Sequence, residues 1–459
     1  MGLPPRVGRP HLHGTTHRVW QEAFVRTRLF TLGLLGAAAL YAACSAGDAG
    51  STIGEEGGGG DGSTTTTGNT GGSTSTGEGG IDFSGSGGHQ GGGFPCDDTV
   101  TDFDQDGFST AEGDCNDCDP NVNPGAVEVQ TDPMTNPDMI DEDCDGEIDE
   151  VIPTCDAGIF FDEIDAMKAA QTIELCDVAT PGGKDYGVLQ AFWGHANGAQ
   201  AVPAQQPQFG MQADFGPNVQ TQAGDRMLVL SSGHARLPTQ ANAATNNSAN
   251  PQGFTPLVPP AGFPQNVPGC DGGTDIYDDI ALNLRLRAPT NATGFKYRFK
   301  FYSFEFAEYV CTNFNDQYIA LVNPPPMGSL NGNISFDSNN NPVSVNLAFF
   351  DVCDPVANND FAAYCLTGCP AQPNPYCPLG PAELAGNGFD DAFGSNFEDA
   401  GGTSWLETTA PIDGGSEFDI RFAIWDTGDS AYDSSVLIDG FQWVATPGTQ
   451  IGTVPPPPQ

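Results

Sequence analysis

Aromatic and polar residues alternate over residues 295–306, which read Phe-Lys-Tyr-Arg-Phe-Lys-Phe-Tyr-Ser-Phe-Glu-Phe. This period of two is typical of a β-strand with one buried face. Further apolar stretches predict strands at 226–233, 317–322, 343–350, 418–425 and 436–444. The segments between them are rich in Pro, Asn and Gly, and the strands do not alternate with helices. The pattern therefore predicts a mainly β protein, with an antiparallel β-sandwich over about residues 155–447.

One segment of this region has a helical pattern instead. Within residues 162–175, Ile164, Met167 and Ala170 fall on one side of a helix. Asp162 precedes them and is expected to cap the helix N-terminus, and the predicted helix ends at Cys176.

An apolar run over residues 29–43 follows Arg26 and Arg28. It is shorter than the roughly 20 residues needed to span a bilayer, and its length suits a secretory signal peptide. The run ends in Leu40-Tyr-Ala-Ala-Cys44, which resembles a bacterial lipobox with Tyr41 at a position where Leu is usual. The resemblance implies that residues 1–43 are removed, that Cys44 is lipidated, and that the protein resides at the outer membrane or cell surface. The alternative is an ordinary cleaved signal peptide with Cys44 in a disulfide.

A segment of low complexity separates the signal peptide from the rest of the chain. Gly, Ser and Thr make up 35 of the 51 residues from Ser45 to Pro95. Such a composition cannot bury a core, so residues 44–95 are expected to form a disordered tether. The other end of the chain, residues 448–459, is a Pro-rich tail without a hydrophobic anchor.

The cysteines fit an oxidising compartment. The chain has 13 of them, and setting Cys44 aside leaves an even number, which predicts six disulfides in an exported protein. The candidates are Cys96, Cys115, Cys118, Cys144, Cys155, Cys176, Cys270, Cys311, Cys353, Cys365, Cys369 and Cys377.

Two acidic stretches with the pattern Asp-x-Asp-x-Asp-Gly begin at Asp102 and Asp141. Calcium needs six to eight oxygen ligands, and carboxylates at alternate positions of a turning loop supply them, with a glycine at the sharp turn. The twelfth position of the first loop is Gly113 rather than the Glu of an EF-hand, and no amphipathic helices flank it. The expected Ca²⁺ ligands are the side chains of Asp102, Asp104, Asp106, Asp114, Asp117, Asp119, Asp141, Asp143, Asp145 and Asp149, and the main-chain carbonyl of Phe108.

Two alternatives compete with calcium at this segment. The acidic loops could be solvated and bind nothing tightly, or Cys115 and Cys118 could bind Zn²⁺ through their C-x₂-C spacing. The net charge of −44 argues against nucleic acid as a partner and is consistent with partial neutralisation by divalent cations.

The acidic segment resembles a family as a whole. Asp102-Phe-Asp-Gln-Asp-Gly-Phe, Gly113-Asp-Cys-Asn-Asp-Cys-Asp-Pro, Val122-Asn-Pro-Gly-Ala-Val-Glu128 and Asp141-Glu-Asp-Cys-Asp-Gly-Glu-Ile-Asp149 resemble the metal-binding repeat of bacterial surface proteins. The resemblance covers about residues 96–150. It implies a small disulfide-linked calcium-loop module in which Cys115 pairs with Cys144.

The β-rich region resembles another family. Leu228-Val-Leu-Ser-Ser-Gly233, the segment 299–309, Phe314-Asn-Asp-Gln-Tyr318 and the segment 424–439 are similar to the choice-of-anchor L domain. The resemblance spans about residues 155–447 and implies a bacterial extracellular protein. It implies no particular reaction.

Polar residues within these motifs form a candidate second metal or ligand site. The alternative is that the acids and amides hydrogen-bond to the local backbone of turns. The residues concerned are Glu305, Glu308, Asn315, Asp316, Asp426, Asp429 and Asp433.

The sequence does not favour an enzyme. Beyond the signal peptide the histidines are His89, His195 and His234, and the common nucleophile, zinc-protease and phosphate-loop motifs are absent from the sequence. We expect a surface lipoprotein with structural Ca²⁺ and a β-sandwich that adheres to an extracellular protein or glycan. The alternatives are metal acquisition or storage through the acidic segment, and a carbohydrate-active enzyme.

Overall fold

The computed structural model of the chain describes residues 96, 98–129, 139–150, 154–200, 206–245, 247–248, 252–270, 272–307, 309–346, 350–354, 377–390 and 400–457. The proposed signal peptide, Cys44 and the Gly/Ser/Thr-rich tether lie outside these residues. Within the described part of the chain, no helix combines the length and the apolar character required to cross a bilayer.

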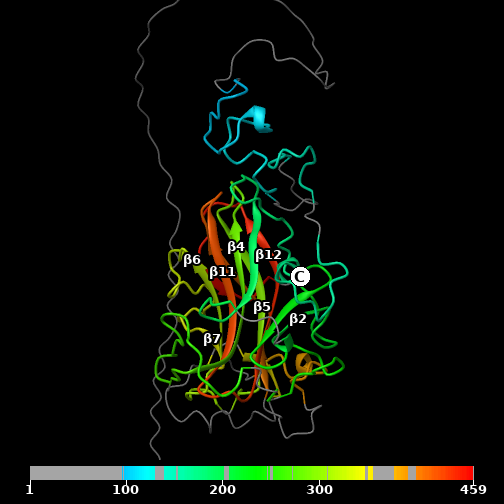
Figure 1. Ribbon diagram of the computed structural model, residues 1–459, viewed down its shortest axis with the longest axis vertical. Coiled ribbons are helices and arrows are strands. Elements are labelled where there is room, and N and C mark those ends of the chain that lie inside the picture. The colour runs from blue at the N-terminus through cyan, green and yellow to red at the C-terminus, as the bar shows by residue number, and fades with distance from the viewer. Residues whose placement is uncertain are drawn as a thin grey trace, which may run out of the picture. The chain divides into compact units, whose positions relative to one another are not determined.

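Two antiparallel sheets make up the β-rich region. The first has the strand order β1-β4-β11-β6-β7, with β1 at Gly187–Gly194, β4 at Ile276–Arg287, β11 at Glu417–Thr427, β6 at Gln317–Asn323 and β7 at Val343–Ser344. The second has the order β13-β10-β5-β12-β3-β2, with β13 at Gly452–Val454, β10 at Leu406–Pro411, β5 at Gly294–Ser303, β12 at Ser434–Val444, β3 at Met227–Ser231 and β2 at Phe209–Gln212. In the second sheet β9, Gly401–Thr403, also pairs with β5 and with β8, Phe350–Cys353. Figure 1 shows the long strands β4, β5, β11 and β12 running along one another.

The alternation that predicts strand β5 also builds the core between the sheets. Phe295, Tyr297 and Phe299 of β5 are fully buried, as successive inward positions of a strand should be. The ring of Phe295 stacks on Phe418 of β11 with centroids 5.6 Å apart, and Tyr297 meets Phe422 edge-on at 5.0 Å. Burying each large aromatic ring contributes about 1.5–3 kcal/mol, which holds the two sheets face to face. The predicted mainly β class is confirmed.

Three predicted segments differ from those observed. The helix is shorter than residues 162–175: α1 spans Ala166–Gln171, and its N-cap is Asp165, whose carboxylate accepts a hydrogen bond from the backbone N–H of Met167 at 2.9 Å. The single strand predicted at 343–350 is replaced by the two short strands β7 and β8. Strand β13 lies inside the stretch that the sequence assigns to the Pro-rich tail.

Short 3-10 helices complete the described elements: η1 at Thr110–Glu112, η2 at Gln206–Gln208 and η4 at Ala382–Leu384. Five disulfides lie within the described residues. They join Cys96 to Cys118, Cys115 to Cys144, Cys155 to Cys176, Cys270 to Cys311 and Cys353 to Cys377. Two further candidates, Cys365 and Cys369, lie outside these residues.

The acidic segment contacts the sandwich at the turn between β4 and β5. Asn291 in this turn accepts a hydrogen bond from the backbone N–H of Val127 at 3.0 Å and donates one to the Val127 carbonyl at 2.7 Å. Its neighbour Thr290 donates its backbone N–H to the carbonyl of Gly125 at 2.8 Å. The buried side chain of Asn291 therefore uses both its oxygen and its nitrogen to hold the acidic segment against the sandwich.

Candidate metal centre

The first acidic loop is folded by its own leading carboxylate. Asp102 accepts hydrogen bonds from the backbone N–H groups of Gln105 at 2.6 Å and Gly107 at 3.1 Å. Gly107 has a φ of 104°, a conformation that residues with a Cβ rarely adopt. The carboxylate and the glycine together bend the chain so that the following acids turn toward Asp102.

The second loop repeats the bond from the glycine to the leading acid, while the other donor comes from the fourth residue after that acid instead of the third. Asp141 accepts hydrogen bonds from the backbone N–H groups of Asp145 and Gly146, each at 3.1 Å, and Gly146 has a φ of 95°. In both loops the next acid accepts from the N–H two residues later, Asp104 from Asp106 and Asp143 from Asp145. The sequence repeat is thus a structural repeat.

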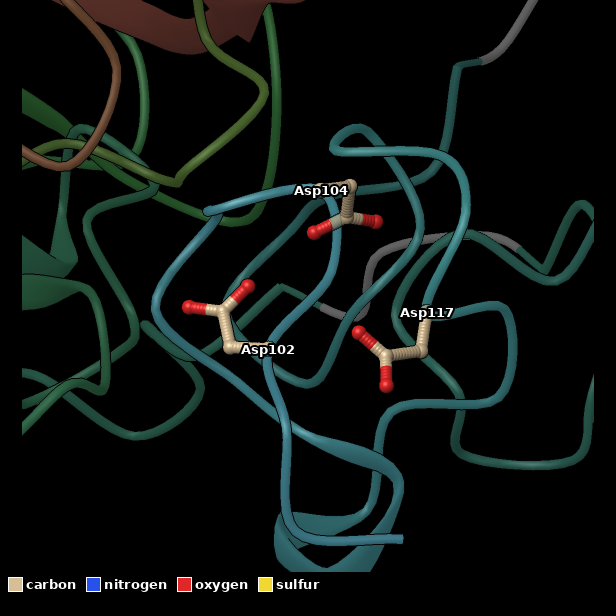
Figure 2. Close-up of side chains that lie close together, drawn as sticks. All are labelled: Asp102, Asp104 and Asp117. Carbon is tan, nitrogen blue, oxygen red and sulfur yellow. The ribbon is translucent and has the colours of Figure 1, made fainter. Parts of the chain in front are cut away.

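The first loop brings carboxylate oxygens together in two overlapping groups. One group comprises Asp102, Asp104 and Asp117, with one oxygen from each within 4.8 Å of the others (Figure 2). The other comprises Asp104, Asp106 and Asp114 under the same limit. Asp104 belongs to both groups, so the first loop can offer oxygens to two neighbouring cations.

The second loop forms two overlapping groups in the same way. Glu128 joins Asp141 and Asp143, and Asp143 joins Asp145 and Glu150. Here Asp143 is the shared acid, at the position equivalent to Asp104 in the first loop.

Several of these oxygens are buried without a hydrogen-bond donor. They are Oδ2 of Asp104, Asp106, Asp114 and Asp117. An unsatisfied buried carboxylate oxygen is costly, and a cation satisfies it. The residues therefore fit a hard divalent cation, for which carboxylate oxygens are the preferred ligands.

The titration of these acids follows from the same geometry. Burial, together with the neighbouring carboxylates of Asp104 and Asp114, raises the pKa of Asp106 to about 6. Burial likewise raises the pKa values of Asp104, Asp114 and Asp143. Lys184 contacts this loop through the carbonyl of Gly107 and the carboxylate of Glu112, which lies in neither group.

Two residues that the sequence analysis did not select take part in these groups. Glu128 is buried, and its carboxylate accepts hydrogen bonds from the backbone N–H groups of Glu142 at 2.9 Å and Asp149 at 2.8 Å. Glu150 follows Asp149 and completes the last group. The motif Val122–Glu128 contained the signal for Glu128, because it belongs to the repeat although it lies outside both acidic runs.

Three predicted ligands are not part of the four acid groups. Asp119 accepts hydrogen bonds from the backbone and side chain of Asn121 at 3.2 and 2.9 Å, as in a local turn. Asp149 is buried and accepts a hydrogen bond from the N–H of Met139 at 3.4 Å. The carbonyl of Phe108 stays a predicted ligand.

The cysteines of this segment bind one another. Cys115 pairs with Cys144, as the family resemblance implied, and Cys96 pairs with Cys118. The zinc alternative is therefore wrong for Cys115 and Cys118, because a disulfide sulfur is not the thiolate that zinc needs. The Cys115–Cys144 disulfide links the segments of the two acidic loops directly.

Comparison with protein families addresses the sandwich. The model of the choice-of-anchor L domain matches residues 208–442. The chain belongs to this family. No curated protein and no solved structure matches the chain. Together with the disulfides, membership indicates a bacterial cell-surface or extracellular protein.

All seven residues of the second predicted site fall within the choice-of-anchor L domain. Glu305, Asp316, Asp426 and Asp433 are buried, and the backbone N–H of Asp316 donates to Glu305 at 3.4 Å. Two others make local or structural contacts: Asp429 accepts from the N–H of Ala431 at 3.0 Å, and Asn315 accepts from the N–H of Asn346 at 3.2 Å. Glu308 lies outside the described residues.

Proposed function

We propose that this choice-of-anchor L protein is a surface lipoprotein whose 96–150 module binds structural Ca²⁺ and whose sandwich binds an extracellular ligand. The observation that carries the calcium proposal is the set of four buried, donorless oxygens in the first loop. The two overlapping acid groups of the second loop, which share Asp143 as those of the first share Asp104, support a repeated site rather than a chance cluster. Oxygen-only ligands favour Ca²⁺ over transition metals.

The proposed role of the ion is to fix the shape of the module. Without a cation the carboxylates of each loop repel one another at neutral pH. The same module presents Gly125 and Val127 to the β4–β5 turn of the sandwich. Calcium would therefore stabilise the module and, through it, this contact.

The ligand-binding proposal rests on a hollow over the outer face of the first sheet. Its volume is about 470 Å³, and two rows of residues that are neighbours across the strands line it. One row is Gln190, Arg285, Asp419 and Asn323, and the other is Phe192, Asn283, Arg421 and Leu321.

These side chains suit a glycan. Planar amide, guanidinium and carboxylate groups can donate hydrogen bonds to neighbouring sugar hydroxyls and accept hydrogen bonds from them, and the ring of Phe192 offers an apolar face to a sugar ring.

We therefore expect Phe192→Ala and Asp419→Asn to abolish binding on a glycan array. Lys296→Ala, on the outer face of the other sheet, is the control. Equal glycan binding by all variants would reject this face as the site.

The calcium proposal is tested by calorimetric titration of the oxidised, exported protein with Ca²⁺. Saturable binding and a higher melting temperature are expected. Asp104→Asn should weaken binding by about tenfold or more, since Asp104 serves both groups of the first loop. Asp98→Asn is the matched control, because Asp98 is exposed and, within the described part of the chain, accepts its hydrogen bonds from the nearby Val100 and Thr101.

The same titration separates the competing function. Tight binding of Zn²⁺ or Cu²⁺ with no response to Ca²⁺ would overturn the structural role and favour metal acquisition. Loss of Ca²⁺ binding in Asp98→Asn as in Asp104→Asn would show a general charge effect instead of a site.

A further inference from the structure

A second group of acids lies inside the choice-of-anchor L domain, far along the sequence from the calcium-loop module. We call Glu305, Asp316, Asp426 and Asp433 the buried acid cluster. Their exposed fractions are 1%, 0%, 1% and 4%. Glu305 follows strand β5, Asp316 precedes β6, Asp426 is near the end of β11, and Asp433 precedes β12. The fold thus brings together acids from both sheets.

Backbone and hydroxyl donors hold two members of the cluster in place. Asp316 accepts hydrogen bonds from the backbone N–H of Thr427 at 3.0 Å and from the hydroxyl of Ser434 at 2.6 Å. Asp433 accepts one from the backbone N–H of Ser248 at 2.7 Å. These contacts are sufficient to explain why Asp316 and Asp433 are buried.

Asp426 differs from its neighbours. Both of its carboxylate oxygens are buried, and neither is satisfied by a hydrogen-bond donor. The acids that act on it electrostatically are Asp316, Asp433 and Asp278. A carboxylate in this position has lost its water and lies among like charges, with the hydroxyl of Ser232 as its favourable polar neighbour, and such an environment is costly.

No basic side chain relieves this cost. Among the described residues, the ion pairs formed by Lys, Arg and His do not include any member of the buried acid cluster. Either a proton or a cation must therefore neutralise Asp426.

The surroundings favour a cation bound by oxygen. The hydroxyl of Ser434 bonds to Asp316, and the hydroxyl of Ser232 accepts the backbone N–H of Ser434 at 2.9 Å, so hydroxyl oxygens lie beside the carboxylates. Cysteine and histidine are not members of the cluster. This donor set matches a hard divalent ion and not a transition metal.

We propose that Asp426, with Asp316, binds a calcium ion inside the choice-of-anchor L domain, independently of the acidic loops at 96–150. The ion joins the end of β11 to the segments that precede β6 and β12. It is a structural ion of the domain itself, and it would persist if the calcium-loop module were inactivated.

Trp425 provides a direct probe of this site. It precedes Asp426 and is fully buried, whereas the 96–150 segment contains neither Trp nor Tyr. Terbium binds at calcium sites and emits when a nearby excited tryptophan transfers energy to it. The oxidised, exported protein is titrated with Tb³⁺ under tryptophan excitation, and Ca²⁺ is then added as competitor.

Two sets of variants assign the signal. The double variant Asp104→Asn with Asp143→Asn disables both loops at their shared acids and should keep the tryptophan-sensitised emission. Asp426→Asn should reduce terbium affinity at this site by about tenfold or more. Asp351→Asn, which removes a partly buried carboxylate that accepts from Ser404 at 2.5 Å, is the control and should leave the emission unchanged.

Stability measurements separate loss of the ion from misfolding. In Ca²⁺, Asp426→Asn should melt at a lower temperature than the parent protein. In chelator it should melt at the same or a higher temperature, because the amide replaces an unpaired buried charge. Absence of Ca²⁺-competed emission in the loop double variant, or an Asp426→Asn variant that binds as many ions as the parent, would overturn the proposal. Neither outcome would bear on binding by the loops.

Discussion

At the scale of single residues, two glycines decide whether the acidic loops can form. Gly107 and Gly146 have φ values of 104° and 95°, and a Cβ at either position would meet no atom within 4 Å. These positions therefore require glycine because of their backbone conformation and not because a side chain would lack space. The leading acid of each loop bonds to the N–H of its glycine, so conformation and carboxylate placement are coupled.

Gly107→Ala should destabilise the first loop, because an alanine at this φ costs about 1–2 kcal/mol. Calcium affinity should fall roughly fivefold to thirtyfold, since the lost free energy must be recovered on binding. Calorimetry measures both affinity and enthalpy. Gly452→Ala is the matched control: its Cβ also meets nothing within 4 Å, and its φ is not in the positive range. Equal affinities for both variants would contradict the role given to the positive φ.

A pair of carboxyl groups away from both metal candidates makes the stability of the sandwich depend on pH. Burial and then Asp439 raise the pKa of Glu174 to about 9, and burial raises the pKa of Asp439 to about 7. The backbone N–H of Gly440 donates to both, at 2.8 and 2.7 Å. Asp156 adds a further negative charge near Glu174, and Arg298 lies opposite Asp439 across the strands.

Since the folded-state pKa values exceed those of unfolded carboxyls, the pair stabilises the folded state at low pH. That contribution is lost progressively as the pH rises from about 4, where the carboxyls of the unfolded chain titrate, to about 7 to 9, where those of the folded protein do. We expect the free energy of unfolding to fall by at least about 1 kcal/mol over this window, by denaturant titration in chelator. Glu174→Gln should flatten the slope relative to the parent, and identical slopes would show that other groups titrate.

At the scale of elements, one buried amide makes two of the contacts between the calcium-loop module and the sandwich. Asn291 uses its oxygen and its nitrogen on the two backbone groups of Val127. Asn291→Ala would leave both groups buried without partners, at about 1–3 kcal/mol each. We expect faster proteolysis within residues 96–150 and unchanged calcium stoichiometry. Asn339→Ala, at an exposed turn, is the control. A proteolysis rate equal to that of the control would argue against this contact.

The elements differ in how far the sequence could predict them. Strand β5 and the two acidic loops were predictable because their signals are local: alternation in one case, and carboxylates two residues apart before a glycine in the other. Strand β4 alternates Leu with Asn283 and Arg285 over its second half, yet its third and fourth residues are Asp278 and Asp279, which are poor strand formers, and no strand was predicted there.

The candidate sites were predictable only in part, because their members meet through the fold. Asp117 joins Asp102 and Asp104 from outside the acidic run, and Glu128 joins the second loop from a distance of 13 residues or more. The burial of Asp426 without a donor is a property of packing between β11 and its neighbours. Sequence spacing cannot distinguish it from Asp429, which bonds to its own turn.

At the scale of the whole molecule, the proposed attachment has a simple consequence. Replacing Cys44 by Ala should release the protein from membranes into the soluble fraction, without changing its melting temperature, because the two sheets and the five described disulfides all lie in residues 96–459. Fractionation and mass spectrometry of the mature N-terminus measure this. Cys96→Ser, a cysteine of the module, controls for general effects of cysteine loss. Membrane retention of the Cys44→Ala variant would reject the lipid anchor.

The disulfide order of the module determines how a pull on the proposed lipid anchor would be transmitted. A force arriving through the tether at Cys96 passes across one covalent bridge to Cys118, along the short chain back to Cys115, and across a second bridge to Cys144. Nearly all of the chain between Cys96 and Cys144 is thereby excluded from the stretched path. A third bridge, from Cys155 to Cys176, shields the next segment before the first sheet. The module would behave as a short, inextensible coupling in which tension reaches the sandwich with little slack released, so that a bound ligand feels the pull almost at once.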